Sequence, residues 1–400
     1  MTGNDRWDLA ARQMRDPQQV FTLSAGELPW DPRLVDTVVK GPFWQTLAEL
    51  GITLLVSREY EHLVLALSCR NEQAWTSVLR LPHPSGIAVN RSNGRVFIAC
   101  TRSPNQVIEF AAADGVLHRN DVPQQAAGGG LVPVATRFFP GCLYLHDLAF
   151  VAGRLMGNAV GLNAVVDLSG PGVHSVWWPR SLDDLQSMRF AHNTIQLNSL
   201  ATSDSLDSTY MSASTERPGA FLPGDVQWEI DRAGVIFSGG TRNVVARGLT
   251  RPHSCRKSSD GLVFVDDSGY GTVNVVDGER TTIIAHLPGW TRGLCIMDRL
   301  AVVGTSRVIP KFACYAPGLD QSESSCGVHF VDIASGRVES SLVWPAGNQI
   351  FGIDWLPSDV ATGFLSGDPT QRSTERDAAW YQFNPPGSSL EPQFLEQQSQ

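Results

Sequence analysis

Six short segments of this chain share one pattern, in which a polar or aromatic residue is followed by small and aliphatic residues. They begin 39 to 61 residues apart, and a turn and a second strand-like run plainly follow four of them. A unit of short strands repeated in this way is typical of a β-propeller, in which each repeat forms one blade. The segments are Ser85-Gly-Ile-Ala, His146-Asp-Leu-Ala, Asn198-Ser-Leu-Ala, His253-Ser-Cys-Arg, Arg292-Gly-Leu-Cys and Phe351-Gly-Ile-Asp.

The two ends of the repeat region complete each other. The last segment, 350–355, has no room for a full blade after it, whereas three strand patterns at about 52–81 precede the first segment. Pairing one C-terminal inner strand with three N-terminal outer strands closes the ring and removes exposed sheet edges. The sequence therefore predicts an all-β fold, a six-bladed β-propeller over 41–357. An N-terminal extension covers 1–40, and a C-terminal tail, partly disordered or draped, covers 358–400.

Charge and composition exclude several classes of partner. The chain has 31 basic and 40 acidic residues, a net charge of -9, and no run of Lys or Arg, so it lacks the basic surface that nucleic acids and anionic membranes require. Its strongly apolar stretches, such as 63–67, are strand-sized and far shorter than a membrane helix. Seven scattered cysteines without a CxxC pair fit a reducing compartment. We expect a soluble, cytoplasmic protein, and its oligomeric state stays open.

The first residues of the six segments should form a ring at one mouth of the central channel, because the innermost strand of each blade lines that channel. Ser85 and Phe351 fit an architectural role in this ring. Two histidines, an asparagine and an arginine at one register make a chemically unusual set. The predicted catalytic residues are His146, Asn198, His253 and Arg292.

A second layer of side chains is expected two positions before the ring. Arg251 would reinforce Arg292 in holding a carboxylate or phosphate, since a guanidinium presents a planar fork to such groups. The alternative for Arg292 is a structural ion pair with Asp354 of a neighbouring blade. Aromatic side chains could wall an organic substrate or simply pack between blades. The predicted substrate-binding residues are Arg251, Tyr144, Gln196, Trp290 and Ser85, and His83 and Gln349 complete the layer.

The two ring histidines allow three interpretations. His146 and His253 could bind a divalent metal such as Zn, Mn or Fe, with an oxygen of Asn198 or Gln196 and water completing the sphere. Without metal, one imidazole could act as a general base and the other as an acid. In the third interpretation both rings only bond to backbone carbonyls. Asp147 should point away from His146, because neighbours on a strand face opposite sides, and we expect it to cap a turn.

The order of the motifs resembles that of an uncharacterised bacterial propeller family. The motifs are Leu-His146-Asp-Leu-Ala, Leu-Asn198-Ser-Leu-Ala, Arg-Pro-His253-Ser, Thr-Arg292-Gly-Leu and Cys326-Gly-Val-His-Phe-Val-Asp, and the resemblance covers about residues 40–357. More distantly, the layout is similar to the six-bladed propellers of the virginiamycin-lyase and strictosidine-synthase class. The family usually has a histidine where this chain has Gln196, so a three-histidine metal site implied by the resemblance lacks its third ligand here.

These observations lead to two functional hypotheses. The first is an enzyme that acts at the mouth on a small anionic or polar organic molecule by elimination, hydrolysis or isomerisation, with or without a metal. The second is a non-catalytic propeller that binds partners on its faces and uses the ring as architecture. The fold cannot separate the two, because propellers serve both purposes.

Overall fold

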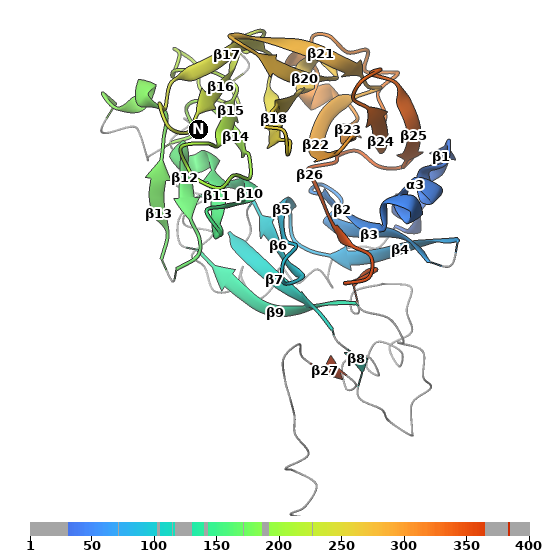
Figure 1. The fold of residues 1–400 in the computed structure, drawn as a ribbon. Helices are drawn as coiled ribbons and strands as arrows, with labels where there is room; N and C mark the ends of the chain where they lie inside the picture. The colour runs from blue at the N-terminus through green and yellow to red at the C-terminus, as the bar shows by residue number, and fades with distance from the viewer. Residues whose placement is uncertain are drawn as a thin grey trace, which may run out of the picture.

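The computed structural model describes residues 31–364, except 71, 102–104, 114, 117–129, 140–142, 171, 186–191 and 226, together with 383–384. Within these residues, six sheets of four or five strands surround one axis, which confirms the six-bladed propeller (Figure 1). Each blade is named here by its innermost strand. Most of the C-terminal tail predicted at 358–400, and residues 1–30 of the predicted extension, lie outside the described residues.

Each blade is an antiparallel sheet whose strands follow one another from the axis outward. The β5 blade contains β5 (Pro84–Asn90), β6 (Arg95–Cys100), β7 (Gln106–Ala112) and β9 (Leu131–Phe138). The β10 blade contains β10 (Leu145–Val151), β11 (Arg154–Ala159), β12 (Ala164–Asp167) and β13 (His174–Trp177). The β14 blade contains β14 (Leu197–Leu200), β15 (Tyr210–Ala213), β16 (Gly234–Ser238) and β17 (Val244–Leu249).

The next two blades complete the run of consecutive repeats. The β18 blade contains β18 (Pro252–Lys257), β19 (Val263–Asp267), β20 (Thr272–Asp277) and β21 (Arg280–His286). The β22 blade contains β22 (Trp290–Met297), β23 (Leu300–Ser306), β24 (Gly327–Asp332) and β25 (Val338–Val343), and β1 (Val38–Lys40) adds a fifth strand at its outer edge. Short 3-10 turns lie between strands: η2 (Pro32–Val35), η3 (Val160–Leu162), η4 (Arg180–Leu182), η5 (Ser268–Tyr270) and η6 (Pro310–Tyr315).

The predicted closure of the ring is confirmed. The β26 blade joins β26 (Gly352–Pro357) to β2 (Ile52–Arg58), β3 (Leu63–Arg70) and β4 (Gln73–Arg80), and β26 pairs with β2 without a break in register. Blue N-terminal strands therefore lie beside the red strand β26 (Figure 1). A short helix, α3 (Phe43–Leu50), precedes β2 and ends at Gly51 in the left-handed conformation (φ 63°) that glycine adopts without strain.

Apolar side chains fill the spaces between blades and under α3. Phe43 of α3 is fully buried and its ring lies 5.2 Å from that of Phe330 on β24. Near the other end of the chain, Ala361 and Phe364 pack with the apolar residues between the β26 and β5 blades. A two-stranded pair, β8 (Gly115–Val116) with β27 (Phe383–Asn384), brings one short piece of the tail to the β7–β9 connection.

The repeated segment keeps its second residue small or polar because that residue faces the inner strand of the next blade. A Cβ added to Gly86 would lie 2.6 Å from the Cα of Asp147, so no side chain fits there. In later blades the same position supplies an acceptor for a backbone N–H of the next inner strand. Ser199 accepts from Cys255 and Ser254 accepts from Gly293, each at 2.8 Å. The pattern found in the sequence therefore reflects contacts between blades.

Among the described residues, no helix combines the length and apolar character needed to cross a membrane.

Candidate functional site

The structure brings four ring residues together at the axis. The rings of His146 and His253 are 5.8 Å apart, and each lies edge-on to Phe351, at 5.1 and 5.6 Å. The guanidinium carbon of Arg292 lies 3.7 Å from the centre of the Phe351 ring. All four side chains are buried, between 1% and 7% exposed. These four of the six predicted ring residues therefore form one cluster, in which Phe351 contacts each of the other three side chains.

Irregular pairing places the ring residues. The register between first and second strand shifts near the ring position in five blades, for example between Leu145 and Asp147 and between His253 and Arg256. Such β-bulges re-aim a side chain and locally increase the twist of the strand. Only the β26 blade keeps regular pairing there. The sequence repeat marked these positions, but nothing in it indicated that the strands bulge at them.

The layer two residues before the ring has a repeated strained conformation. His83, Tyr144, Gln196 and Arg251 all have φ between 45° and 55°, a region that residues other than glycine rarely occupy. Strain that recurs at equivalent positions in four blades must be imposed by the fold, and it turns each chain sharply into its inner strand. None of these residue types signals such a turn in a sequence.

Three of the predicted residues are held by structural bonds. Ser85 donates to the backbone oxygen of Leu145 at 2.7 Å, which ties its blade to the next one. Gln196 accepts from the side-chain amide of Asn193. Asn198 donates to the backbone oxygen of Pro252 at 2.8 Å, but its own side-chain oxygen, Oδ1, is buried without a partner among the described residues.

The hydrogen bond between Arg292 and His253 fixes the state of that histidine. The Nε of Arg292 donates to Nε2 of His253 at 3.1 Å, so Nε2 must be unprotonated. The proton of the neutral ring therefore sits on Nδ1, which lies 2.9 Å from Oγ of Ser254. Burial, and secondarily the Arg292 charge, lower the pKa of His253 well below its usual value. His253 is neutral near pH 7, with its basic nitrogen already occupied.

Two arginines approach the mouth without a carboxylate partner within ion-pair distance in the described part of the chain. Among the described residues, Arg292 makes a single hydrogen bond, to His253, and Arg251 makes none. Burial lowers the pKa of Arg292, and the charge of Glu59 opposes this from beyond ion-pair distance. Burial lowers the pKa of Arg251 to about 10, so it stays charged at neutral pH. The Arg251 guanidinium lies among three aromatic rings, 4.6 Å from Tyr315, 5.6 Å from Trp228 and 5.9 Å from Trp290.

These aromatic neighbours come mostly from loops that sequence analysis missed. Phe312 and Tyr315 lie on η6, and Trp228 lies on the long β15–β16 connection. Tyr60, in the β2–β3 turn, stacks on Phe312 with ring centres 6.1 Å apart. The sequence did offer one signal for these residues. Segment 310–315 begins with proline, lies between two strands and contains two aromatic residues. Of the predicted wall residues, Trp290 joins this group, 5.6 Å from Phe312, and Tyr144 packs on His146 at 4.7 Å.

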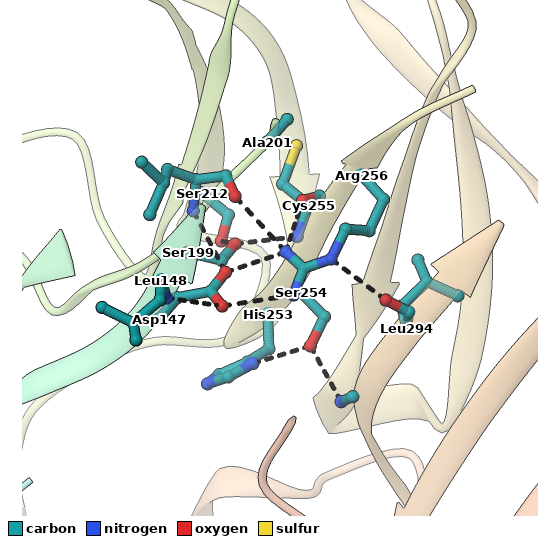
Figure 2. Close-up of polar contacts among 12 residues, drawn as sticks. Asp147, Leu148, Ser199, Ala201, Ser212, His253, Ser254, Cys255, Arg256 and Leu294 are labelled. Carbon is teal, nitrogen blue, oxygen red and sulfur yellow. Dashed lines mark hydrogen bonds and ion pairs between the residues drawn. The ribbon is translucent and has the colours of Figure 1, made fainter. Parts of the chain in front are cut away.

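One expectation and one alternative about acidic residues are wrong. Asp147 does not cap a turn: its carboxylate forms a two-pronged ion pair with Arg256, at 2.8 and 3.2 Å (Figure 2). The bulge at Leu145–Asp147 sets aside the simple alternation on which the expectation rested. Asp354 does not pair with Arg292, because it bonds instead to Arg91 and to the backbone N–H of Val89.

The donor set does not fit a resident metal. Among the described residues, no three side chains of His, Cys, Asp or Glu converge as ligands would. Of the two predicted ligands, His253 already uses Nε2 to accept from a cationic arginine, and that cation would repel a metal ion at the same nitrogen. The metal predicted at His146 and His253 therefore remains a prediction without geometric support.

A separate cavity of about 420 Å³ lies on the outer edge of the propeller. Arg232, Arg247 and Arg280 are among its lining residues, with Glu279 and the exposed Ile283. Two of these arginines are already paired, Arg232 with Asp267 and Arg247 with Glu216. The mouth is the stronger candidate site, because its cations have no ion pair with any described residue and its side chains converge from different blades.

Fold and site together define a six-bladed propeller with a basic, aromatic-walled mouth. The chain belongs to the family described as "Domain of unknown function (DUF4915)", whose model matches residues 41–363. None of the curated protein sequences matches this chain.

Solved structures similar to this chain share little sequence with it. One, titled "Crystal structure of Nidogen/Laminin Complex", is 10% identical with a TM-score of 0.50 over 78% of this chain and 99% of its own. A gluconolactonase from Xanthomonas campestris is 13% identical, with a TM-score of 0.43 over 74% of this chain and 86% of its own. A protein of unknown function from Bacteroides caccae is 8% identical, with a TM-score of 0.44 over 76% and 97%. The first of these likenesses concerns the fold alone.

Proposed function

We propose that the mouth of this propeller binds a small organic anion and acts on it as an enzyme. The observation that carries the proposal is the pair of cations, Arg251 and Arg292, which lie near the axis without a carboxylate within ion-pair distance in the described part of the chain. Removing a charge from water costs several kcal/mol unless an opposite charge compensates it. A bound anion would supply that compensation, since both guanidiniums are close enough to repel each other.

Further buried groups at the mouth lack partners and suit the same ligand. Nε of Arg251 and Nε1 of Trp290 are buried donors without an acceptor among the described residues, and oxygens of an anion would accept from them. Two buried acceptors, Oδ1 of Asn198 and Oε1 of Gln349, also lack a donor. A ligand that carries a hydroxyl or amide beside its anionic group would satisfy both kinds.

His146 is the residue we assign to proton transfer. Its ring lies 5.8 Å from His253 and 5.1 Å from Phe351, directly beside the basic cluster, and it comes from a different blade. His253 is a poor base, because its unprotonated nitrogen already accepts from Arg292. In an elimination, hydrolysis or isomerisation, His146 would take or return the proton while the two arginines hold the anionic group.

Binding can be tested with the full chain and a panel of small anions. We would record the melting temperature and titration heat with benzoate, succinate, lactate and inorganic phosphate. At least one organic anion should bind, and Arg292→Gln should weaken its binding at least tenfold. The exposed Arg299, which pairs with Asp332 and Glu339, gives the control Arg299→Gln, which should bind normally.

Two outcomes would favour the alternative, a non-catalytic binding or scaffold protein. One is that none of these anions raises the melting temperature. The other is that Arg292→Gln binds as the control does. A third outcome would overturn only the catalytic part of the proposal. If an anion binds to wild type and not to Arg292→Gln, but wild type forms no product that His146→Gln fails to form, the mouth is an anion-binding site without catalysis. Stoichiometric metal that disappears in both His146→Ala and His253→Ala would instead restore the metal-assisted reaction.

A further inference from the structure

A line of four side chains runs from the core of the β18 blade to the mouth. It begins at Asp266 on β19, passes through Ser254 and His253 on β18, and ends at Arg292 on β22. Ser254 lies 2.9 Å from Nδ1 of His253, and Figure 2 shows this contact together with the bond from the next blade to Ser254. His253 accepts from Arg292 at 3.1 Å. None of these links was visible in the sequence, which marked only His253 and Arg292.

Ser254 does more than join blades. Its counterpart in the preceding blade, Ser199, likewise accepts a backbone N–H of the next inner strand at 2.8 Å, and both residues are buried. Ser199 then bonds to Ser212, whereas Ser254 contacts His253. Ser254 is also held at φ 53°, a conformation that costs a serine free energy. The blade contact alone explains neither the histidine contact nor the strain.

The donor and the acceptor of each hydrogen bond in this line can be assigned, starting from Arg292. Arg292 can only donate, so Nε2 of His253 accepts and Nδ1 carries the proton of the neutral ring. Nδ1–H then donates to Ser254, which also accepts from the Gly293 N–H. With both lone pairs used, the hydroxyl of Ser254 has its own hydrogen left to donate, and it needs an acceptor.

The carboxyl of Asp266 is available as that acceptor, because neither of its oxygens has a hydrogen-bond partner among the described residues. Its carboxyl is fully buried, and it lies directly across from His253 in the β18–β19 ladder. Burial raises the pKa of Asp266 well above its usual value, and the hydrogen bond from Ser254 is the largest influence that lowers it. Neither carboxyl oxygen reaches a partner at full hydrogen-bond geometry within the described residues, so the contact with Ser254 is loose. A buried carboxyl costs stability unless it is paired, and Asp266 has no ion pair among the described residues, although the charge of Arg256 acts on it.

We infer that Asp266 and Ser254 are positioning residues which preset Arg292 to receive one carboxylate group end-on. By holding His253 as the Nδ1–H form, they keep Nε2 available to capture Nε of Arg292. Nε of Arg292 is then occupied, and Phe351 covers one face of the guanidinium. The two terminal nitrogens are therefore the donors that bind the two oxygens of a carboxylate. This inference rests on the proposed function and narrows its ligand from an organic anion to a carboxylate.

The protonation of His253 can be read without any ligand. The full chain, with ¹⁵N-labelled histidine, would be examined by long-range ¹H–¹⁵N NMR, and the His253 signals assigned by their loss in His253→Gln. We expect a proton on Nδ1 only, unchanged from pH 8 to pH 5.5. Ser254→Ala should give a mixture of both neutral forms, whereas the matched variant Ser199→Ala should keep the Nδ1–H form. A wild-type ring protonated on Nε2 would overturn the inference even if the variants fail to fold.

Asp266 is tested by a conservative and a disruptive change. Asp266→Asn keeps an oxygen that can accept from Ser254 and should retain the Nδ1–H form of His253, whereas Asp266→Leu should lose it.

Binding gives the second readout. Benzoate should bind at least tenfold more weakly to Ser254→Ala than to Ser199→Ala, and wild type should bind benzoate more tightly than inorganic phosphate. Equal benzoate affinity in the two serine variants would contradict the carboxylate assignment. Tighter binding of phosphate than of benzoate to wild type would contradict it as well.

The two proposals fail in distinguishable ways. If no anion binds but His253 carries its proton on Nδ1 and responds to Ser254→Ala, the line of contacts stands and the proposed function falls. If anions bind through Arg292 while the protonation of His253 is unchanged in Ser254→Ala, the proposed function is supported and the positioning role is contradicted.

Discussion

The guanidinium of Arg256 and the carboxylate of Asp147 pair across a blade that lies between their own. Arg256 belongs to β18 and Asp147 to β10, and the β14 blade separates them. The same guanidinium donates to the backbone oxygen of Leu294 in the β22 blade (Figure 2) and to that of Leu200 in the β14 blade. One side chain therefore connects four consecutive blades close to the axis. Burial alone would lower the pKa of Arg256, but the attraction of Asp147 raises it overall.

Breaking this pair on one side should be costly. Arg256→Met leaves the 3% exposed carboxylate of Asp147 without its cation, and such an uncompensated buried charge costs about 3–5 kcal/mol. We expect the free energy of unfolding in urea to fall by that amount. The double variant Asp147→Leu with Arg256→Met should recover most of the loss, because no charge is then buried. A double variant as unstable as the single one would show that the arginine matters through its backbone bonds instead.

Close packing of inner strands gives a second prediction. At Gly86 a methyl group would meet the backbone of Asp147 at 2.6 Å, and backbone cannot move aside as a side chain can. Gly86→Ala should lower the free energy of unfolding by about 1–3 kcal/mol, the usual cost of overpacking. Gly170 has ordinary backbone angles and open space around it, so Gly170→Ala is the matched control and should be close to neutral. Equal stabilities would contradict the packing argument.

The architecture was predictable because its signals are local and repeated. Each inner strand starts with the same small-residue pattern, and the orphan strands at both ends indicated the closure of β26 on β2. The pairing of Asp147 with Arg256 was not predictable, because 109 residues separate them and each looked like an ordinary strand residue. The expectation that Asp147 caps a turn failed because its carboxylate pairs with Arg256, which lies two blades further along the ring.

The site was only partly predictable for a similar reason. The register of the repeat brought His146, His253, Arg292 and Phe351 into one set. It could not indicate which of them contact, because those contacts depend on bulges and on four left-handed residues whose types favour no such turn. Ser254 and Asp266 were not assigned to the site, since a serine beside a histidine has no meaning until the strand angles are known. Aromatic side chains of η6 and the β15–β16 connection lie outside the repeat altogether.

Buried histidines should make the stability of the fold depend on pH. His329 is 1% exposed, with its two ring nitrogens 2.9 Å from Oγ1 of Thr305 and 2.8 Å from Oγ of Ser341, and burial lowers its pKa to about 4. Since the unfolded chain takes up this proton near pH 6.5, the stabilisation is complete above that pH. It is lost as the pH falls from about 6.5 to 4.

The expected loss from His329 is about 3 kcal/mol at pH 4, at 1.36 kcal/mol for each pH unit. Urea unfolding of wild type and His329→Gln at pH 7.5, 5.5 and 4.5 measures it. The variant should show a shallower decline with acid, because glutamine does not titrate. His253 should add to the decline in the same direction, since its pKa is also lowered. Parallel pH profiles for the two proteins would mean that His329 does not titrate in this range.

Arg292 should respond to replacement in the opposite sense from Arg256, although both are arginines near the axis. Arg256 is paired with Asp147, whereas Arg292 has no ion pair among the described residues: it contacts the neutral His253 and the face of Phe351, and the charge of Glu59 attracts it only from beyond ion-pair distance. Removing an uncompensated buried cation relieves its desolvation cost, so Arg292→Met should not lower the free energy of unfolding and should raise it by up to about 2 kcal/mol. The measurement is urea unfolding in a buffer free of carboxylates and phosphate, with Arg256→Met in parallel. A residue kept for binding at the expense of stability behaves in this way. If Arg292→Met destabilises the protein as much as Arg256→Met does, Arg292 belongs to the architecture and the mouth loses its anion site.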